Sequence, residues 1–197
     1  MNELILIDLF DKEIGYAEKS DIHKKGILHR AFSIFIYNDD KMLIQRRAYN
    51  KYHSGGLWAN ACCSHPMKGE DIISTIHKRL QYELDIHEQA CSFKEVFNFV
   101  YFQKYSDDLF EYEYDHVFLA DYCGIFHANP IEIEETKWIA FDELKDDLLK
   151  NPEKYSAWFL IAAPKVLKLL YKKKGTLQCP LCQDKDFQFD SEPDISN

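Results

Sequence analysis

The spacing of the apolar residues changes at Asp71, and this change constrains the fold more than any other feature of the sequence. Before Asp71, residues 4–8, 31–37 and 42–46 are typical of strands, and an Asn38-Asp39-Asp40 turn joins the last two into a hairpin. After it the apolar residues follow helical spacing, with Ile72, Ile73, Ile76, Leu80 and Leu84 on one face. Strands followed by an amphipathic helix predict a sheet that a helix covers.

The rest of the chain repeats this order of strands and helices. Strand patterns occur at 95–102, 111–122 and 136–141, and helical patterns follow at 142–150 and about 153–173. Pro164 lies inside the last helical pattern, and we expect it to kink or split that helix. This order predicts an α+β fold, in which a mixed β-sheet is flanked by helices in an α/β/α layered arrangement.

Length and composition favour one globular domain. We expect this domain to cover residues 1–173, followed by a polar tail over 174–197. Residues 53–71 are dense in Gly, Ser, Asn and Pro, which predicts an ordered but irregular loop. The formal net charge of −9 argues against a general affinity for nucleic acid or an anionic membrane, and no apolar run reaches the length of a membrane span.

The cysteines are read together with the N-terminal sequence. The stretch MNELILIDLFDKE has an early acid and no basic region, so it does not resemble a secretory signal. We therefore expect a cytoplasmic protein with mostly reduced thiols at Cys62, Cys63, Cys91, Cys123, Cys179 and Cys182. The last two form a CxxC pair without a second pair, for which exposed free thiols are favoured over an intermolecular metal clip.

Three histidines and two glutamates form a candidate metal site. In a strand, residues 111 and 113 point to the same face, and that face continues with Asp115 and Val117, so part of it is buried. Buried carboxylates need a cation, whereas solvated ones do not. Each of these residues alone is typical of an ordinary surface or core position. Together they make a plausible octahedral set for Mn²⁺, Zn²⁺ or Mg²⁺: His23, His29, His65, Glu111 and Glu113.

A second group is basic. For any single member, solvated surface charge is the better interpretation. If they converge beside a metal, their guanidinium and ammonium groups would bind a phosphorylated small molecule. Glu83, late in the predicted helix, could hold a divalent ion that bridges to the phosphate. The group consists of Lys19, Arg46, Arg47, Lys51 and Arg79.

A third group is Cys63, Tyr101 and Trp158. A cysteine beside a metal can act as an acid or a base if its pKa is tuned, and an indole face can stabilise a cation. Each of the three is equally compatible with a packed core position. Cys62 is the weaker candidate of the adjacent cysteines, because neighbouring residues tend to point apart.

These residues lie in stretches that are similar to one known family. The stretches are HKKGILHRAFS, LIQRRA, GLWANACCSHP, GED, RLQYELDI, EYEYDHVF and YSAWFL, in the family's order over about residues 4–170. The chain thus resembles the type 1 isopentenyl-diphosphate isomerases, which have the Nudix fold. The resemblance implies isomerisation of isopentenyl diphosphate to dimethylallyl diphosphate through a tertiary carbocation-like intermediate. It also implies a small allylic or homoallylic diphosphate as partner, and a monomer or weak homodimer.

The resemblance also implies roles for single residues. One divalent metal would be held by His23, His29, His65, Glu111 and Glu113, and a second one, Mg²⁺, would come with the diphosphate and bind Glu83. Catalysis would rest on Cys63 and Glu113, with Tyr101 supporting the proton transfer and Trp158 facing the alkyl part. Contacts to the diphosphate would come from Lys19, Arg47, Lys51 and Arg79.

One departure bears on the competing hypotheses. The stretch Lys78-Arg79-Leu80-Gln81-Tyr82-Glu83 lacks the paired glutamates of Nudix hydrolases, and Asp85 stands where glycine is usual. This disfavours the first alternative, a hydrolase of nucleoside diphosphate derivatives. The second alternative, a non-catalytic metal- or redox-binding protein, is disfavoured because the candidate residues are scattered over the whole chain.

Overall fold

The computed structural model describes residues 3–173, in which nine strands form one mixed sheet. The strands are β1 (Glu3–Ile7), β2 (Glu13–Glu18), β3 (His29–Asn38), β4 (Lys41–Arg47), β5 (Trp58–Ala59), β6 (Cys62–Ser64), β7 (Phe93–Ser106), β8 (Leu109–Asp121) and β9 (Ile133–Ala140). The helices are α1 (Lys19–Lys25), α2 (Ile72–Leu84), α3 (Phe141–Lys150) and α4 (Ala157–Lys173). Short 3-10 turns lie at Glu88–Ala90 and Pro152–Lys154.

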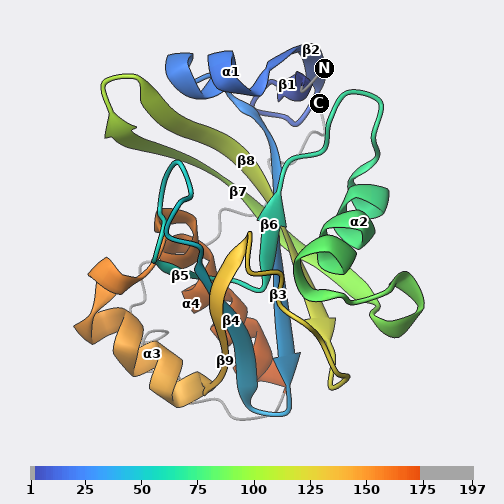
Figure 1. Ribbon diagram of the computed structural model, residues 1–197, viewed down its shortest axis with the longest axis vertical. Helices are drawn as coiled ribbons and strands as arrows, with labels where there is room; N and C mark the ends of the chain where they lie inside the picture. Colours follow the sequence, from blue (N-terminus) through green and yellow to red (C-terminus); the bar gives the residue numbers. More distant parts are fainter. Residues whose placement is uncertain (1–2, 174–197) are drawn as a thin grey trace, which may run out of the picture.

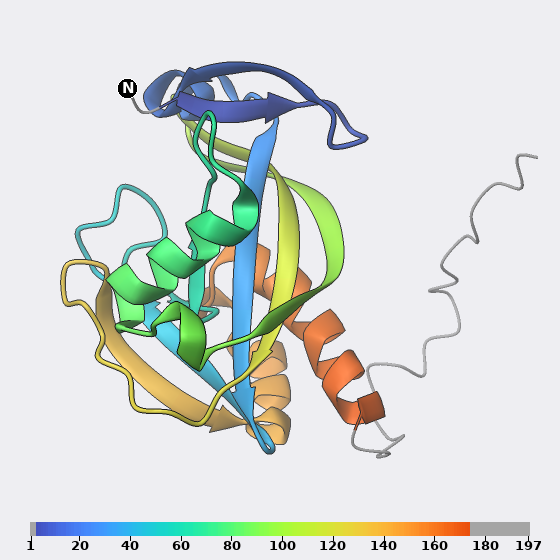
Figure 2. The ribbon, with the colours of Figure 1, turned by 90° about the vertical axis from the view of Figure 1, so that its right-hand side faces the viewer.

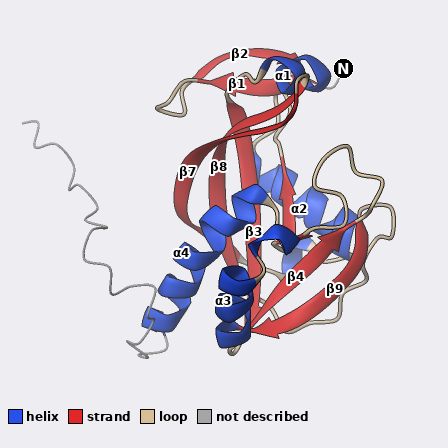
Figure 3. Ribbon diagram, turned by 90° about the vertical axis from the view of Figure 1, so that its left-hand side faces the viewer, coloured by secondary structure: helices blue, strands red, loops and turns tan. Residues whose placement is uncertain are grey.

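The sheet lies between two helical layers. Strand β3 runs through the middle of the molecule, with α2 on one side and α3 and α4 on the other (Figure 1). Helix α2 covers one face of the sheet (Figure 2), and α3 and α4 cover the opposite face (Figure 3). The prediction of an α+β fold with a mixed sheet between helices is therefore confirmed.

Strand β3 is the centre of the sheet. It pairs in parallel with β8, from His29 opposite Glu113 to Tyr37 opposite Asp121. On its other edge it pairs antiparallel with β6, where Ser33 lies opposite Cys63, and with β4 near the hairpin turn. Because both faces of β3 are covered, its sequence is a nearly continuous apolar run. This strand thus brings residues of β6 and β8 close together.

Two apolar cores hold the layers together. Of the five α2 side chains predicted to share one face, Ile76, Leu80 and Leu84 are buried in a core with Phe32 and Ile34 of β3. Ile72 is partly buried at the edge of this core, and Ile73 is 44% exposed, contrary to the prediction. On the other face, α3 and α4 pack on β4, β7 and β9 in a second core. Burial of such residues stabilises a fold by about 1.5–3 kcal/mol per large side chain.

Several short elements were not predicted. The side chains of strand β2 are mostly exposed, so it has no apolar alternation to reveal it. Helix α1 has only seven residues. Strands β5 and β6 lie within the predicted irregular loop of 53–71, and they are too short to show a period.

The last helix also differs from the prediction. Helix α4 begins at Ala157 rather than near 153, after the turn at Pro152–Lys154. It continues through Pro164 without being split, because Ala162, Ala163, Val166 and Leu167 on both sides of the proline pack in the same core. The apolar contacts outweigh the hydrogen bond that a proline removes from a helix.

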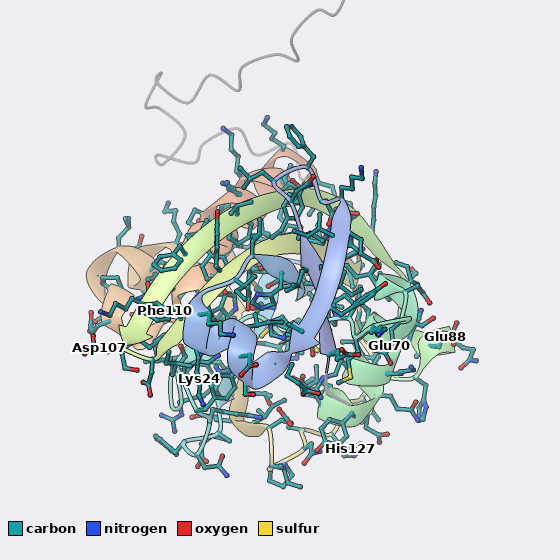
Figure 4. The ribbon with its side chains drawn as sticks, turned by 90° about the horizontal axis from the view of Figure 1, so that it is seen from above. Lys24, Glu70, Glu88, Asp107, Phe110 and His127 are labelled. Carbon is teal, nitrogen blue, oxygen red and sulfur yellow. The ribbon has the colours of Figure 1, made fainter. Side chains whose placement is uncertain are left out.

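Helix α1 and the β1–β2 hairpin lie over one end of the sheet. Seen from above, α1 lies beside the strand that carries Phe110 (Figure 4). The helix ends at Gly26, which adopts a left-handed φ of 62°, and a Cβ there would lie 3.2 Å from the ring of Phe102. Glycine therefore lets the chain turn from α1 into β3 while remaining in contact with β7 and β8.

Three further expectations concern the chain as a whole. Among residues 3–173, no helix combines the length and the apolar character that crossing a membrane requires. The four cysteines in this part, Cys62, Cys63, Cys91 and Cys123, are free thiols. The expected polar tail over 174–197, with Cys179 and Cys182, lies outside the described residues.

Candidate functional site

A cavity of about 290 Å³ lies where the two helical layers meet the sheet. It is lined by residues of α1, β3, β6, α2, β8 and α4. Eleven of the fourteen candidate residues line it: Lys19, Arg47, Lys51, Cys63, His65, Arg79, Glu83, Tyr101, Glu111, Glu113 and Trp158. His29 lies next to this lining, with its Nε2 3.6 Å from Oε1 of Glu113. The ring of His23 contacts those of His29 and His65 edge to face.

Three histidines and one glutamate form a compact cluster. One potential ligand atom from each of His23, His29, His65 and Glu113 lies within 4.8 Å of those of the others. Nε2 of His65 is 2.7 Å from Oε1 of Glu113, and Nε2 of His29 is 3.6 Å from the same oxygen. They come from α1, the start of β3, the residue after β6, and β8. The fold therefore gathers ligands from four separate segments.

The local contacts of the histidines prepare them to bind a metal. Nδ1 of His23 donates to the carbonyl of Lys19 at 2.7 Å, and Nδ1 of His29 donates to that of Ile27 at 2.9 Å. These bonds leave the lone pair of each ring on Nε2. The Tyr52 hydroxyl lies 3.5 Å from Nε2 of His23, whereas Nε2 of His29 is buried without any hydrogen-bond partner. A divalent cation would satisfy this orphaned atom.

Burial also sets the charge of this cluster. It lowers the pKa of His65 to about 3 and that of His23 to about 4, so both rings are neutral at pH 7. Burial alone would raise the pKa of Glu113, but His65 and His29 hold it well below its usual value. Neutral imidazoles and an ionised carboxylate are the forms that bind a metal. The donor set therefore fits a divalent metal ion.

Glu111 lies beside this cluster rather than within it. It shares the buried face of β8 with Glu113, Asp115 and Val117, as the alternation predicts. Its Oε1 lies 2.8 Å from Nε2 of His53. Its Oε2 accepts hydrogen bonds from two tyrosines, Tyr105 at 2.9 Å and Tyr101 at 3.0 Å.

Tyr101 links the two glutamates. Its hydroxyl is 2.7 Å from Oε2 of Glu113 and 3.0 Å from Oε2 of Glu111, so its one proton can be donated to either carboxylate. The strand pairing explains this position, because Tyr101 of β7 lies directly opposite Glu113 of β8. The side chain is buried, which strengthens the hydrogen bond that it makes to either carboxylate.

The two adjacent cysteines point to opposite faces of β6. Cys62 packs in the apolar core under α2, and Cys63 lines the cavity. Burial raises the pKa of the Cys63 thiol to about 12, although the Arg47 guanidinium, 3.8 Å from the sulfur, acts in the other direction. The thiol is therefore protonated at pH 7.

Trp158 forms an aromatic wall of the cavity. Its indole Nε1 donates to Oδ1 of Asn60 at 2.9 Å, and the guanidinium of Arg47 lies 5.2 Å from its ring centroid. Asn60 is fully buried and also donates to the carbonyls of Ile34 and Cys62. One asparagine thus fixes both the tryptophan and the backbone next to Cys63.

Four of the five basic residues converge on the cavity. Lys19 and Arg47 approach from α1 and β4, and burial lowers the pKa of Lys19. Lys51 pairs with Glu132, and Arg79 lies between Glu132 at 3.4 Å and Glu83 at 2.6 Å. The fifth, Arg46, pairs with Glu135 at 3.1 Å and does not line the cavity.

Glu83 is a buried carboxylate at this cationic end. Its Oε1 accepts from Arg79, and its Oε2 accepts from Nε2 of Gln45 at 3.1 Å. Helix α2, which carries Glu83 and Arg79, begins at Asp71, whose carboxylate accepts from the backbone N–H of Ser74. It ends at Asp85, which takes the left-handed conformation (φ 55°) that glycine usually adopts.

Four further residues of the site were not predicted from the sequence. They contact residues that were predicted, and they are His53, Asn60, Gln45 and Glu132. His53 stands in KYHSGG between Lys51 and the glycines, so its position next to a predicted ligand is the only signal that could have identified it. Glu132 reaches the cavity only because β9 pairs with β4, which a single sequence does not reveal.

The chain is similar to known proteins in sequence and in fold. A model of the NUDIX domain matches residues 27–159. Isopentenyl-diphosphate Delta-isomerase 2 of Aromatoleum aromaticum is 41% identical over 167 residues, covering 84% of this chain and 87% of the relative. The protein of the same name from Photorhabdus laumondii is 44% identical over 161 residues, covering 79% and 87%. A crystal structure from Deinococcus radiodurans superposes with a TM-score of 0.70 at 17% identity, covering 83% of this chain and 98% of that one.

Proposed function

The chain belongs to the isopentenyl-diphosphate Delta-isomerases of the NUDIX domain family, and from this premise we propose how its cavity performs the isomerisation. The reaction converts isopentenyl diphosphate into dimethylallyl diphosphate. It adds a proton to the terminal carbon of the double bond and removes one from the carbon on the other side. The enzyme therefore needs an anion site, two proton carriers and a wall that tolerates positive charge.

One observation supports this proposal above the others. Cys63 and Glu113 stand on β6 and β8, which pair with the two opposite edges of β3, and both side chains line one cavity with Trp158. Proton addition and removal at two carbons of a small substrate require such a pair. Because the thiol is protonated and the carboxylate is ionised, the pair holds one transferable proton. The group that donates in one direction accepts in the other.

We propose that Tyr101 and Trp158 assist these two carriers. The Tyr101 hydroxyl can follow the charge of Glu113, because it donates to this carboxylate when it is ionised and can move to Glu111 when it is protonated. The indole of Trp158 would face the alkyl part of the substrate. A desolvated ring stabilises a nearby cation by about 2 kcal/mol, which favours the carbocation-like intermediate.

The metal would be held by His23, His29, His65 and Glu113, and we propose Glu111 as a further ligand. His53 and Tyr105 occupy two of the roughly four lone-pair positions of the Glu111 carboxylate, and Tyr101 takes a third only when its proton leaves Glu113, so at least one stays open for a metal. A bound Mn²⁺, Zn²⁺ or Mg²⁺ would supply positive charge that increases the acidity of a protonated Glu113. The histidines would fix the orientation of this carboxylate.

The diphosphate would bind at the cationic end of the cavity. We propose contacts from Lys19, Arg47, Lys51 and Arg79, which converge there from four segments. Glu83, buried beside Arg79, would bind the Mg²⁺ that accompanies the diphosphate. Cleavage of the diphosphate is disfavoured, because α2 carries Glu83 but not the paired glutamates that hydrolysis with several Mg²⁺ ions requires.

The proposal is tested by proton exchange. Isopentenyl diphosphate is incubated with the enzyme in D₂O with Mn²⁺ and Mg²⁺ and followed by NMR. Deuterium should enter dimethylallyl diphosphate, and the Cys63→Ala variant should show no turnover while it keeps its metal. The matched control is Cys62→Ala, which should stay active because Cys62 points into the apolar core. Near-normal turnover by Cys63→Ala would refute the mechanism.

A further inference from the structure

One carboxylate lies where the substrate's own negative charge is expected. Glu132 stands in the segment just before β9, and its side chain is 16% exposed. Its backbone is fixed at both ends: its N–H donates to the carbonyl of Asn129, and its carbonyl accepts from the N–H of Ala48, both at 3.0 Å. The fold therefore fixes the backbone of Glu132 beside the cavity, which limits how far its carboxylate can move.

Glu132 contacts two of the proposed diphosphate ligands at once. One oxygen, Oε2, pairs with Nζ of Lys51 and lies 3.4 Å from Nη2 of Arg79. Burial alone would raise the pKa of Glu132, but the hydrogen bond from Lys51 and the charge of Arg79 lower it below its usual value. The carboxylate is thus ionised at pH 7 and occupies cations that a phosphate oxygen would use.

We infer that Glu132 is a built-in competitor of the diphosphate: it holds Lys51 and Arg79 between turnovers and is displaced when a diphosphate binds. This inference rests on the proposed function of the cationic end. A trianionic or tetra-anionic diphosphate must replace the carboxylate at both cations and then tolerate its charge nearby. Glu132 should therefore weaken the binding of every diphosphate, with or without its hydrocarbon part.

Such a competitor suits an isomerase. The diphosphate does not react, so its contacts are equal in substrate, transition state and product, and tighter contacts lower KM without raising kcat. They would also slow the release of dimethylallyl diphosphate, which carries the same charge as the substrate. The carboxylate of Glu132 reduces both effects. It also offsets the repulsion between the positive charges of Lys51 and Arg79 while the cavity is free of substrate.

The test measures the binding of inorganic diphosphate to the full chain by calorimetry, once in EDTA and once in Mg²⁺. Glu132→Gln should bind about tenfold more tightly than the natural chain in both conditions, because one like charge is removed at close range. Glu132→Asp, which keeps the charge but withdraws it by one methylene, should lie between them. The matched control is Glu135→Gln, three residues along the chain, which pairs with Arg46 away from the cavity and should change nothing.

Three outcomes would overturn the inference, and they differ from one another. Unchanged or weaker binding by Glu132→Gln in EDTA would show that Glu132 positions the cations rather than competes for them. Tighter binding in EDTA but weaker binding in Mg²⁺ would make Glu132 a ligand of the metal. If the natural chain binds no diphosphate at all, the proposed anion site fails, and the inference fails with it. In support, Glu132→Gln should lower KM for isopentenyl diphosphate about tenfold without raising kcat.

Discussion

Asn60 is the buried residue whose replacement should damage both the stability and the site. Its side chain makes three hydrogen bonds in a fully buried position. Oδ1 accepts from Nε1 of Trp158 at 2.9 Å, and Nδ2 donates to the carbonyls of Ile34 at 3.2 Å and Cys62 at 2.6 Å. The variant Asn60→Ala removes these hydrogen bonds from the indole N–H of Trp158 and from the carbonyls of Ile34 and Cys62.

The magnitude follows from these contacts. A buried polar group that loses its partner costs about 1–3 kcal/mol, and some of the cost is recovered when the backbone adjusts. We therefore expect Asn60→Ala to lower the free energy of unfolding by about 3–5 kcal/mol, a large part of the ~5–15 kcal/mol that is typical of a domain. Turnover of the folded fraction should also fall, because Trp158 and the backbone of Cys62 lose their common anchor.

Urea unfolding measures the loss of stability, provided that the dependence of the free energy on urea concentration is the same in both proteins. The NMR assay in D₂O measures the loss of turnover. The variant Trp158→Phe removes only the indole donor, so Asn60→Ala and Trp158→Phe together should cost about 1 kcal/mol less than the sum of the single changes. Additive costs, or a loss below about 1 kcal/mol for Asn60→Ala, would refute the reasoning that these hydrogen bonds stabilise the site.

Two further predictions concern the histidines. His53→Phe keeps a ring beside Tyr105 but removes the contact with Glu111, so the affinity for Mn²⁺ should fall about tenfold or more in calorimetry. The control His77→Phe should keep its affinity, and an equally unchanged affinity in His53→Phe would contradict a supporting role of His53. Burial lowers the pKa of His65 to about 3, below about 6.5 in an unfolded chain, so unfolding takes up a proton below pH 6.5. The free energy of unfolding of the EDTA-treated chain, measured with urea, should therefore fall as the pH falls from about 6.5 towards 3. His65→Asn should lose less of this free energy over the same pH range. An equal dependence on pH in both proteins would exclude this linkage.

Regular elements with strong periods could be predicted from the sequence. The alternation in EYEYDHVF gave the common face of Glu111 and Glu113, and the 3.6-residue spacing gave α2 with Leu80 and Leu84 in the core. Both patterns depend on neighbours along the chain, so one sequence is enough to show them. They also placed the two carboxylates on the buried face of β8, where Glu113 joins the histidine cluster.

The remaining features depend on contacts between distant segments. The contact of His53 with Glu111 requires the loop after β4 to fold against β8, and Glu132 reaches Lys51 only through the pairing of β4 with β9. Helix α1 was missed because Ile22 and His23 are its only buried residues, although it carries His23 of the histidine–glutamate cluster. Short elements that are fixed by tertiary contacts leave little trace in the local pattern.

The parallel pairing of β3 with β8 also has a consequence for synthesis on the ribosome. His29 leaves the ribosome early, but Glu113, its partner in the register, is made only after all of residues 30–112. Such non-local pairing delays folding until both strands are available. A nascent chain therefore exposes three imidazoles and two adjacent thiols before the carboxylate that completes their cluster exists.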